Sequence, residues 1–147
     1  MKNSISKQRI YSSLLILGAF ILFYRTFSMI FFENALNLLN TWVIVLLFIE
    51  SLIDILCIVF SIRWFISNDY TKDSIPLQLG AAAAIFHAFR VLIYVLGRTG
   101  PWVNFDIRPE YQSTYTFNYF WVWFAAVLSI LGIIGVVVIW IFRRHNK

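Results

Sequence analysis

The stretch Thr41–Phe65, TWVIVLLFIESLIDILCIVFSIRWF, is apolar almost throughout and holds two acidic residues, Glu50 and Asp54, near its middle. A helix needs about 20 residues to cross the roughly 30 Å hydrocarbon core of a bilayer, and this stretch is longer than that. Its apolar residues are continuous rather than alternating, which predicts a helix and not a barrel strand. We therefore expect a transmembrane helix here, with Asn40 as its N-cap.

Three further runs have the same character, at about residues 11–32, 77–96 and 118–142. The whole chain is 61% hydrophobic and only 13% charged, whereas an average soluble domain is about 45–50% apolar and about 25% charged. The first run has a basic front like a secretory signal, but no small-x-small cleavage site follows it, so we expect it to be retained. The sequence predicts an all-α integral membrane protein, a four-transmembrane-helix bundle that forms a single membrane domain over residues 1–147.

Lysine and arginine residues near the ends of the spans predict the orientation. One side of the predicted bundle collects Lys2, Lys7, Arg9, Arg63, Lys72, Arg143, Arg144 and Lys147, and the other side collects Arg98 and Arg108. By the positive-inside rule, both termini are expected in the cytoplasm (N-in/C-in), at the cell membrane if the source is prokaryotic. The net charge of +5 therefore marks topology, and we expect no nucleic-acid partner.

The connection 97–117 is predicted to be external and is rich in aromatic residues, among them Trp102, Phe105, Tyr111 and Tyr115. Aromatic side chains gather at the headgroup level of a bilayer, which is one explanation of this composition. Loops of this length without regular structure are uncommon and often bind partners, which is the other. The segment is thus either part of an interfacial belt or a docking surface.

Polar residues inside the spans fall on two helical stripes. In the second span, Glu50, Asp54, Cys57 and Ser61 follow one another at intervals of four, three and four residues. The third span carries its own stripe at the same spacing: Gly80, Ala83, His87, Arg90, Tyr94 and Gly97. Residues three and four apart share a helix face, so the two polar faces are expected to meet.

The rise of about 1.5 Å per residue gives the depth of each group. On this count Arg25, Glu50 and Arg90 share one level, and Asp54 and His87 share a second level near the midplane. Intramembrane charges are costly and usually face a partner or a cavity. We interpret the five residues either as ion pairs that fix helix register, or as a proton or ligand network with Asp54 and His87 at its centre.

Other chemistry is not indicated. The single cysteine, Cys57, excludes an internal disulfide and a cysteine-based zinc site, and one intramembrane histidine gives no complete ligand set for a metal or haem. We expect no metal, no cofactor and no assignable catalytic residue.

Three functions remain open on the sequence. The first is a non-catalytic subunit or accessory component of a larger membrane complex, in contact with the lipid bilayer and with other membrane subunits or further copies of itself. The second is a small proton-coupled transporter or channel that uses Asp54 and His87. The third is a membrane enzyme that acts on a lipid or isoprenoid substrate, with His87 and an acid as its acid and base.

Overall fold

The structure is a computed structural model that describes residues 2–145, so Lys147, which was counted toward the orientation, lies outside the described residues. Its elements are α1 (Lys2–Phe31), α2 (Ala35–Leu38), α3 (Thr41–Ile66), α4 (Ser74–Thr99), the 3-10 turn η1 (Pro109–Tyr111) and α5 (Tyr119–His145). Residues 2–145 contain no strand, and one isolated β-bridge joins Leu39 to Ile107.

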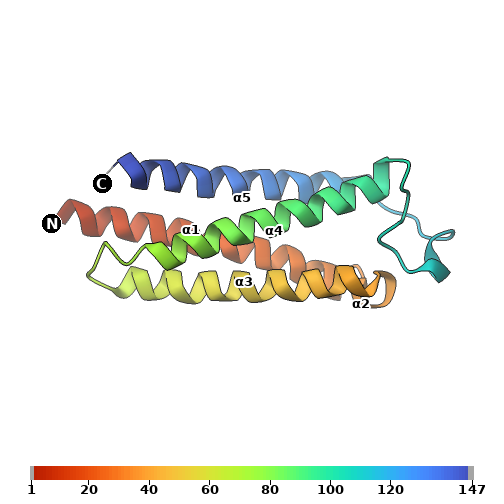
Figure 1. Ribbon diagram of the computed structural model, residues 1–147, viewed down its shortest axis with the longest axis horizontal. Coiled ribbons are helices and arrows are strands. Elements are labelled where there is room, and N and C mark those ends of the chain that lie inside the picture. The colour runs from red at the N-terminus through yellow and green to blue at the C-terminus, as the bar shows by residue number, and fades with distance from the viewer. Residues whose placement is uncertain (1, 146–147) are drawn as a thin grey trace.

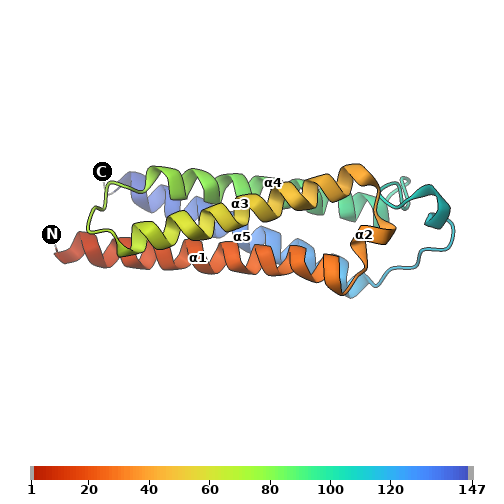
Figure 2. The ribbon, with the colours of Figure 1, turned by 90° about the horizontal axis from the view of Figure 1, so that it is seen from below.

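Four long helices run side by side along the length of the molecule, and both ends of the chain lie at the same end of the bundle (Figure 1). Helix α3 packs between α1 and α4, and α5 packs on α4 and more lightly on α1, which closes the bundle. We call the end with the two termini and the α3–α4 connection the terminal end. The opposite end, with α2 and the 100–118 connection, is the loop end (Figure 2).

Each of these four helices is long and apolar enough to cross a membrane, which confirms the predicted all-helical, four-span architecture. Membrane insertion and the cytoplasmic position of the termini stay predictions. The boundaries differ most at α1, which begins at Lys2 rather than near residue 11. The buried amide of Gln8 explains this extension, because it donates to the main-chain carbonyls of Trp64 and Ser67 at the end of α3.

The predicted start of α3 is confirmed, and the predicted end of α4 is not. Asn40 is the N-cap residue of α3, but its side chain makes no capping hydrogen bond; its amide nitrogen donates instead to the carbonyls of Phe105 (3.1 Å) and Ile107 (3.0 Å). Helix α4 continues past Gly97 and ends at Thr99. Gly97 therefore lies inside the helix, and its lack of a side chain makes room for Asp106, because a Cβ there would stand 2.6 Å from Oδ1 of that residue.

Candidate functional site

The two predicted polar stripes both point into the bundle. On α3 the buried residues include Glu50, Asp54, Cys57 and Ser61, and on α4 they include Gly80, Ala83, His87, Arg90, Tyr94 and Gly97. The structure therefore confirms that the polar faces of these neighbouring helices are turned inward. We call Glu50, Asp54, His87 and Arg90 the α3–α4 polar cluster.

Asp54 and His87 form the most deeply enclosed pair of this cluster. Oδ2 of Asp54 lies 2.7 Å from Nε2 of His87, and both side chains are 0% exposed. The other ring nitrogen, Nδ1, lies 3.7 Å from Oε2 of Glu50. A histidine held between two carboxyl groups can keep or pass on a proton, so this pair has the components of a relay.

Glu50 and Arg90 form the second pair, one helical turn away. Arg90 donates its Nε hydrogen to Oε2 of Glu50 at 2.5 Å, and its Nη1 lies 2.7 Å from the sulfur of Met29 on α1. Arg90 thus contacts two other helices from α4. Because arginine is always protonated, its positive charge is a fixed counter-charge for Glu50.

Arg25 does not join this cluster, so its predicted grouping with Glu50 is wrong. Its Nη1 lies 2.5 Å from Oε1 of Glu33 and 3.1 Å from Oγ of Ser28. Helix α1 ends at Phe31, and the main-chain N–H of Glu33 turns back to the carbonyl of Ser28. This turn brings the carboxyl group of Glu33 to Arg25, a contact that helical spacing does not predict because Glu33 lies beyond the end of α1.

The cluster contains two carboxyl groups, one arginine and one histidine, and its hydrogen bonds are incomplete. Oε1 of Glu50, Oδ1 of Asp54, Nδ1 of His87 and Nη2 of Arg90 are buried without a hydrogen-bond partner among the described residues. The four side chains of the cluster are 0–2% exposed, and none of them lines the two apolar hollows described below. The cluster is enclosed on all sides by its own helices.

The loop end holds a second ion pair that sequence reasoning missed. Arg98 binds both carboxylate oxygens of Asp106, with Nη1 to Oδ1 at 2.7 Å and Nη2 to Oδ2 at 3.0 Å. Its guanidinium also lies 4.7 Å from the ring centre of Tyr94 and 4.9 Å from that of Tyr115. The sequence held one indication of this pair: Arg98 and Asp106 carry opposite charges and are eight residues apart, with the turn-forming Gly100 and Pro101 between them.

The 100–118 connection is fixed to its own bundle. Arg108, which the sequence analysis used only as an orientation charge, donates to the carbonyls of Leu36 and Leu39 at 3.0 Å. Ile107 is fully buried in a core of six residues, Met29, Ala35, Leu39, Val43, Leu47 and Ile107. The connection therefore closes the loop end as a cap.

The four predicted docking aromatics divide into two pairs. Trp102 and Tyr111 are exposed, whereas Phe105 and Tyr115 are half-buried. Phe105 stacks on Trp42 of α3 with ring centres 6.0 Å apart, and burial raises the pKa of the Tyr115 hydroxyl. Of these four aromatic residues, Trp102 and Tyr111 are the two that remain exposed and available to a partner.

The bundle also contains apolar hollows. A cavity of about 310 Å³ lies between α1, α4 and α5, with Cys57 of α3 at its floor. Its lining is apolar apart from the Cys57 thiol, and Leu17 and Leu131 at its rim are exposed, so it is a groove open on the outer side of α1 and α5 and not a sealed void.

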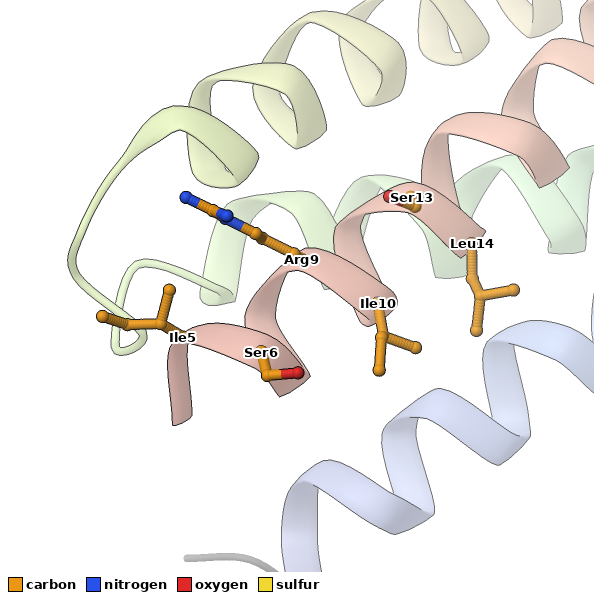
Figure 3. Close-up of a pocket in the computed structure, with 6 residues that line it drawn as sticks. All are labelled: Ile5, Ser6, Arg9, Ile10, Ser13 and Leu14. Atoms are coloured by element: carbon orange, nitrogen blue, oxygen red, sulfur yellow. The ribbon is translucent and has the colours of Figure 1, made fainter. Parts of the chain in front are cut away.

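A wider, shallower groove of about 580 Å³ runs along the terminal end of α1. Figure 3 shows that Ile10 and Leu14 project to one side of it, while Arg9 points away from them. The guanidinium of Arg9 stacks instead over the ring of Phe65, 5.9 Å from its centre. Because its polar groups do not converge, this groove does not form a site.

Within residues 2–145, no three His, Cys, Asp or Glu side chains are grouped so that they could hold a metal ion. No protein-family model matches the chain, and no curated protein or solved structure is significantly similar to it. The geometry and the sequence alone must therefore support any assignment of function.

Proposed function

We propose that this protein is a small polytopic membrane protein that acts as a non-catalytic subunit or accessory component of a larger membrane complex. In this proposal the α3–α4 polar cluster fixes the bundle, and α5 presents the surface that meets a partner. The observation that supports it most directly is a contrast in burial. The charged residues of the α3–α4 polar cluster are paired and buried, whereas one face of α5 is uncharged and exposed along its length.

The first support comes from the cluster. It links α3 to α4 through two pairs and reaches α1 through Met29, so it ties three helices together at defined positions. Removing one partner of a buried ion pair is strongly destabilising, which makes such pairs effective at fixing helix register. A cluster that is enclosed and held together by paired contacts suits a structural role better than turnover of a substrate.

The second support comes from α5. Only 12% of its most apolar window is buried inside the bundle, compared with 44% for α4. Its outer stripe consists of exposed residues at helical spacing: Phe120, Trp123, Val127, Ile130, Ile134, Val137 and Ile141. Trp102 and Tyr111 are exposed in the preceding connection, so a partner on α5 could also contact aromatic side chains beyond the bilayer.

Site-directed photo-crosslinking in native membranes tests this proposal. A photoreactive phenylalanine analogue at Trp123 or Ile130 on α5 should give a discrete heavier adduct. The same analogue at Leu52 or Val59 on the outward side of α3, which is exposed to a similar degree, serves as the matched control and should not. Equal adducts from both helices, or none from α5, would contradict the proposal.

One observation favours a second function, a proton-coupled transporter or channel. Asp54 and His87 lie 2.7 Å apart in the membrane-spanning part of the chain, with Glu50 next to the same ring. Reconstitution into liposomes that contain a pH-sensitive dye tests it. Proton flux that disappears in Asp54→Asn and His87→Gln would support transport, and absent or unchanged flux would exclude it.

The third function, a membrane enzyme acting on lipid or isoprenoid, is not supported by the geometry. It requires an opening from the bilayer to His87, but that side chain is 0% exposed and does not line the hollow between α1, α4 and α5. A lipid substrate could reach its ring only if the helices packed around it moved apart.

A further inference from the structure

A groove of about 300 Å³ lies between the end of α3 and the start of α4, at the terminal end of the bundle. Sites for small ligands span about 300–1,000 Å³, so this groove is large enough to take one chemical group. Its lining includes two basic residues, Arg63 and Lys72, and the apolar side chains of Phe60 and Ile75. No acidic residue of the described chain lines it. We call it the basic groove.

Both cationic groups of the basic groove are available to an anion. The Arg63 side chain is exposed, and among the described residues it makes no hydrogen bond or ion pair. Nζ of Lys72 lies 3.9 Å from Oδ2 of Asp69, with the two side chains 68% and 44% exposed, and an ion pair of this kind contributes little. Asp73 is 4% exposed and does not line the groove. The groove therefore presents positive charge without a fixed counter-charge.

The surface that leads from the basic groove toward the middle of α3 is apolar. Val59 and Leu56 precede Arg63 by four and seven residues, so the three share one helix face. The side chains of Val59 and Leu56 are 53% and 37% exposed, and Ile75 on α4 is 52% exposed. A ligand that fits both parts has to be anionic at one end and apolar along the rest. A phospholipid with a negatively charged headgroup has this arrangement, whereas inorganic phosphate would use only the basic part.

We propose that the basic groove binds the headgroup of an anionic phospholipid, with Arg63 and Lys72 contacting the phosphate and one acyl chain lying along Val59 and Leu56. Under the predicted N-in/C-in orientation the groove faces the cytoplasmic leaflet, where anionic lipids attract basic residues at the ends of spans. Long basic side chains at a helix end can keep their charge at the headgroup level while their apolar stems lie along the helix. Binding here requires insertion of the four helices into a membrane but not membership of a complex, so it can be tested separately from crosslinking at α5.

Native mass spectrometry of the purified protein gives the first test. The protein is equilibrated in detergent micelles with equal amounts of phosphatidylglycerol and phosphatidylcholine that carry identical acyl chains. The wild type should retain one phosphatidylglycerol per chain in preference to phosphatidylcholine. Each basic residue near an anionic lipid surface contributes about fivefold in affinity, so Arg63→Gln/Lys72→Gln should lower that preference on the order of 25-fold.

Arg9→Gln/Arg144→Gln is the matched control, because it removes the same charge from exposed side chains at the terminal end that do not line the basic groove. It should change the preference by less than about twofold. An equal loss in the control would show diffuse attraction instead of a site, and an unchanged preference in Arg63→Gln/Lys72→Gln would show that these residues do not bind the lipid; either result would overturn the proposal. Displacement of the lipid by inorganic phosphate would also overturn it, because the occupant would then be a free anion.

Photo-labelling of the wild-type protein gives a second test that needs no variant. The protein is reconstituted in phosphatidylcholine vesicles with a trace of a photoreactive lipid, either phosphatidylglycerol or phosphatidylcholine, that carries a diazirine near the headgroup end of one acyl chain. Adducts at Ile75 or Val59 should be several-fold more abundant with the anionic probe. Leu92 is the matched control, because it is equally exposed (52%) on α4 outside the groove, and both probes should label it alike. Equal labelling of Ile75 and Val59 by the two probes would contradict the proposal.

Discussion

The α3–α4 interface and the interface of α5 with its neighbours are formed by different kinds of residue. Between α3 and α4 the contacts include the Asp54–His87 and Glu50–Arg90 pairs, at 2.7 and 2.5 Å. Helix α5 meets its neighbours through apolar and small residues, as where Gly132 approaches Leu22. Both interfaces are packing contacts between long apolar helices, yet among the described residues only the first contains ion pairs.

This difference shows how the register of one helix against another can be specified where the surroundings are apolar. Lipid chains are as apolar as leucine, so little hydrophobic driving force distinguishes one helix register from another. A buried carboxylate and guanidinium meet in one register only, whereas an apolar surface accepts several with similar energy. The α3–α4 interface is therefore expected to resist change strongly, and the α5 interface weakly.

The largest effect is expected from Arg90→Met. It leaves the buried Glu50 carboxylate without its counter-charge, and loss of one partner of such a pair costs about 3–5 kcal/mol. The free energy of unfolding, measured by titration with dodecyl sulfate in mixed micelles, should fall by that amount. The double variant Glu50→Met/Arg90→Met should regain most of it, and Arg63→Met on the exposed end of α3 should change little. A loss below about 1 kcal/mol in Arg90→Met would remove the contrast between the interfaces.

A smaller effect is expected from Asp54→Leu. The substitution removes the hydrogen bond to Nε2 of His87 and leaves a buried polar atom unsatisfied, which costs about 1–3 kcal/mol. Asp54→Asn retains an oxygen and a hydrogen-bonding group of the same size, so it should lose less. The same unfolding titration checks both variants, and an equal loss in the two would show that charge rather than hydrogen bonding holds this pair.

A change at Gly97, beside the 100–118 connection between α4 and α5, is expected to have an effect of intermediate size. In Gly97→Ala, the new Cβ would stand 2.6 Å from Oδ1 of Asp106 and displace it from Arg98, at a cost of about 1–2 kcal/mol. Proteolysis should then cut the 100–118 connection faster than in the wild type. Gly18→Ala, where a Cβ meets nothing within 4 Å, is the control. Unchanged cleavage would mean that the Arg98–Asp106 pair does not hold the cap.

The smallest effect is expected on α5. A Cβ in Gly132→Ala would lie 3.5 Å from Cδ2 of Leu22, an ordinary van der Waals distance. Because alanine is the better helix former by about 1 kcal/mol, the free energy of unfolding should stay level or rise slightly. A loss of more than about 1 kcal/mol would show that α5 is held as specifically as α4.

The sequence predicted the parts of this molecule that depend on local helix geometry. The stripes through Asp54 and His87 follow from the spacing of three and four residues, and so does the inward direction of both faces. The cap at the loop end does not, because Asn104 takes a positive φ of 58° and Asp106 turns back to Arg98. Such contacts depend on the path of the loops, which helical spacing does not predict. The grouping of Arg25 was wrong for the same reason, because its partner Glu33 lies in the turn after α1.

The short connection of residues 67–73 between α3 and α4 has a consequence for synthesis of the chain. Helix α3 leaves the ribosome with two acidic groups, and each charged residue opposes insertion at a helix centre by about 2.5–3.5 kcal/mol. The 33 residues that follow Ile66, up to Thr99, emerge within roughly 2–7 s at ordinary elongation rates. Joint insertion of α3 and α4 as a hairpin would bring His87 and Arg90 to Asp54 and Glu50 before either helix had to enter lipid alone.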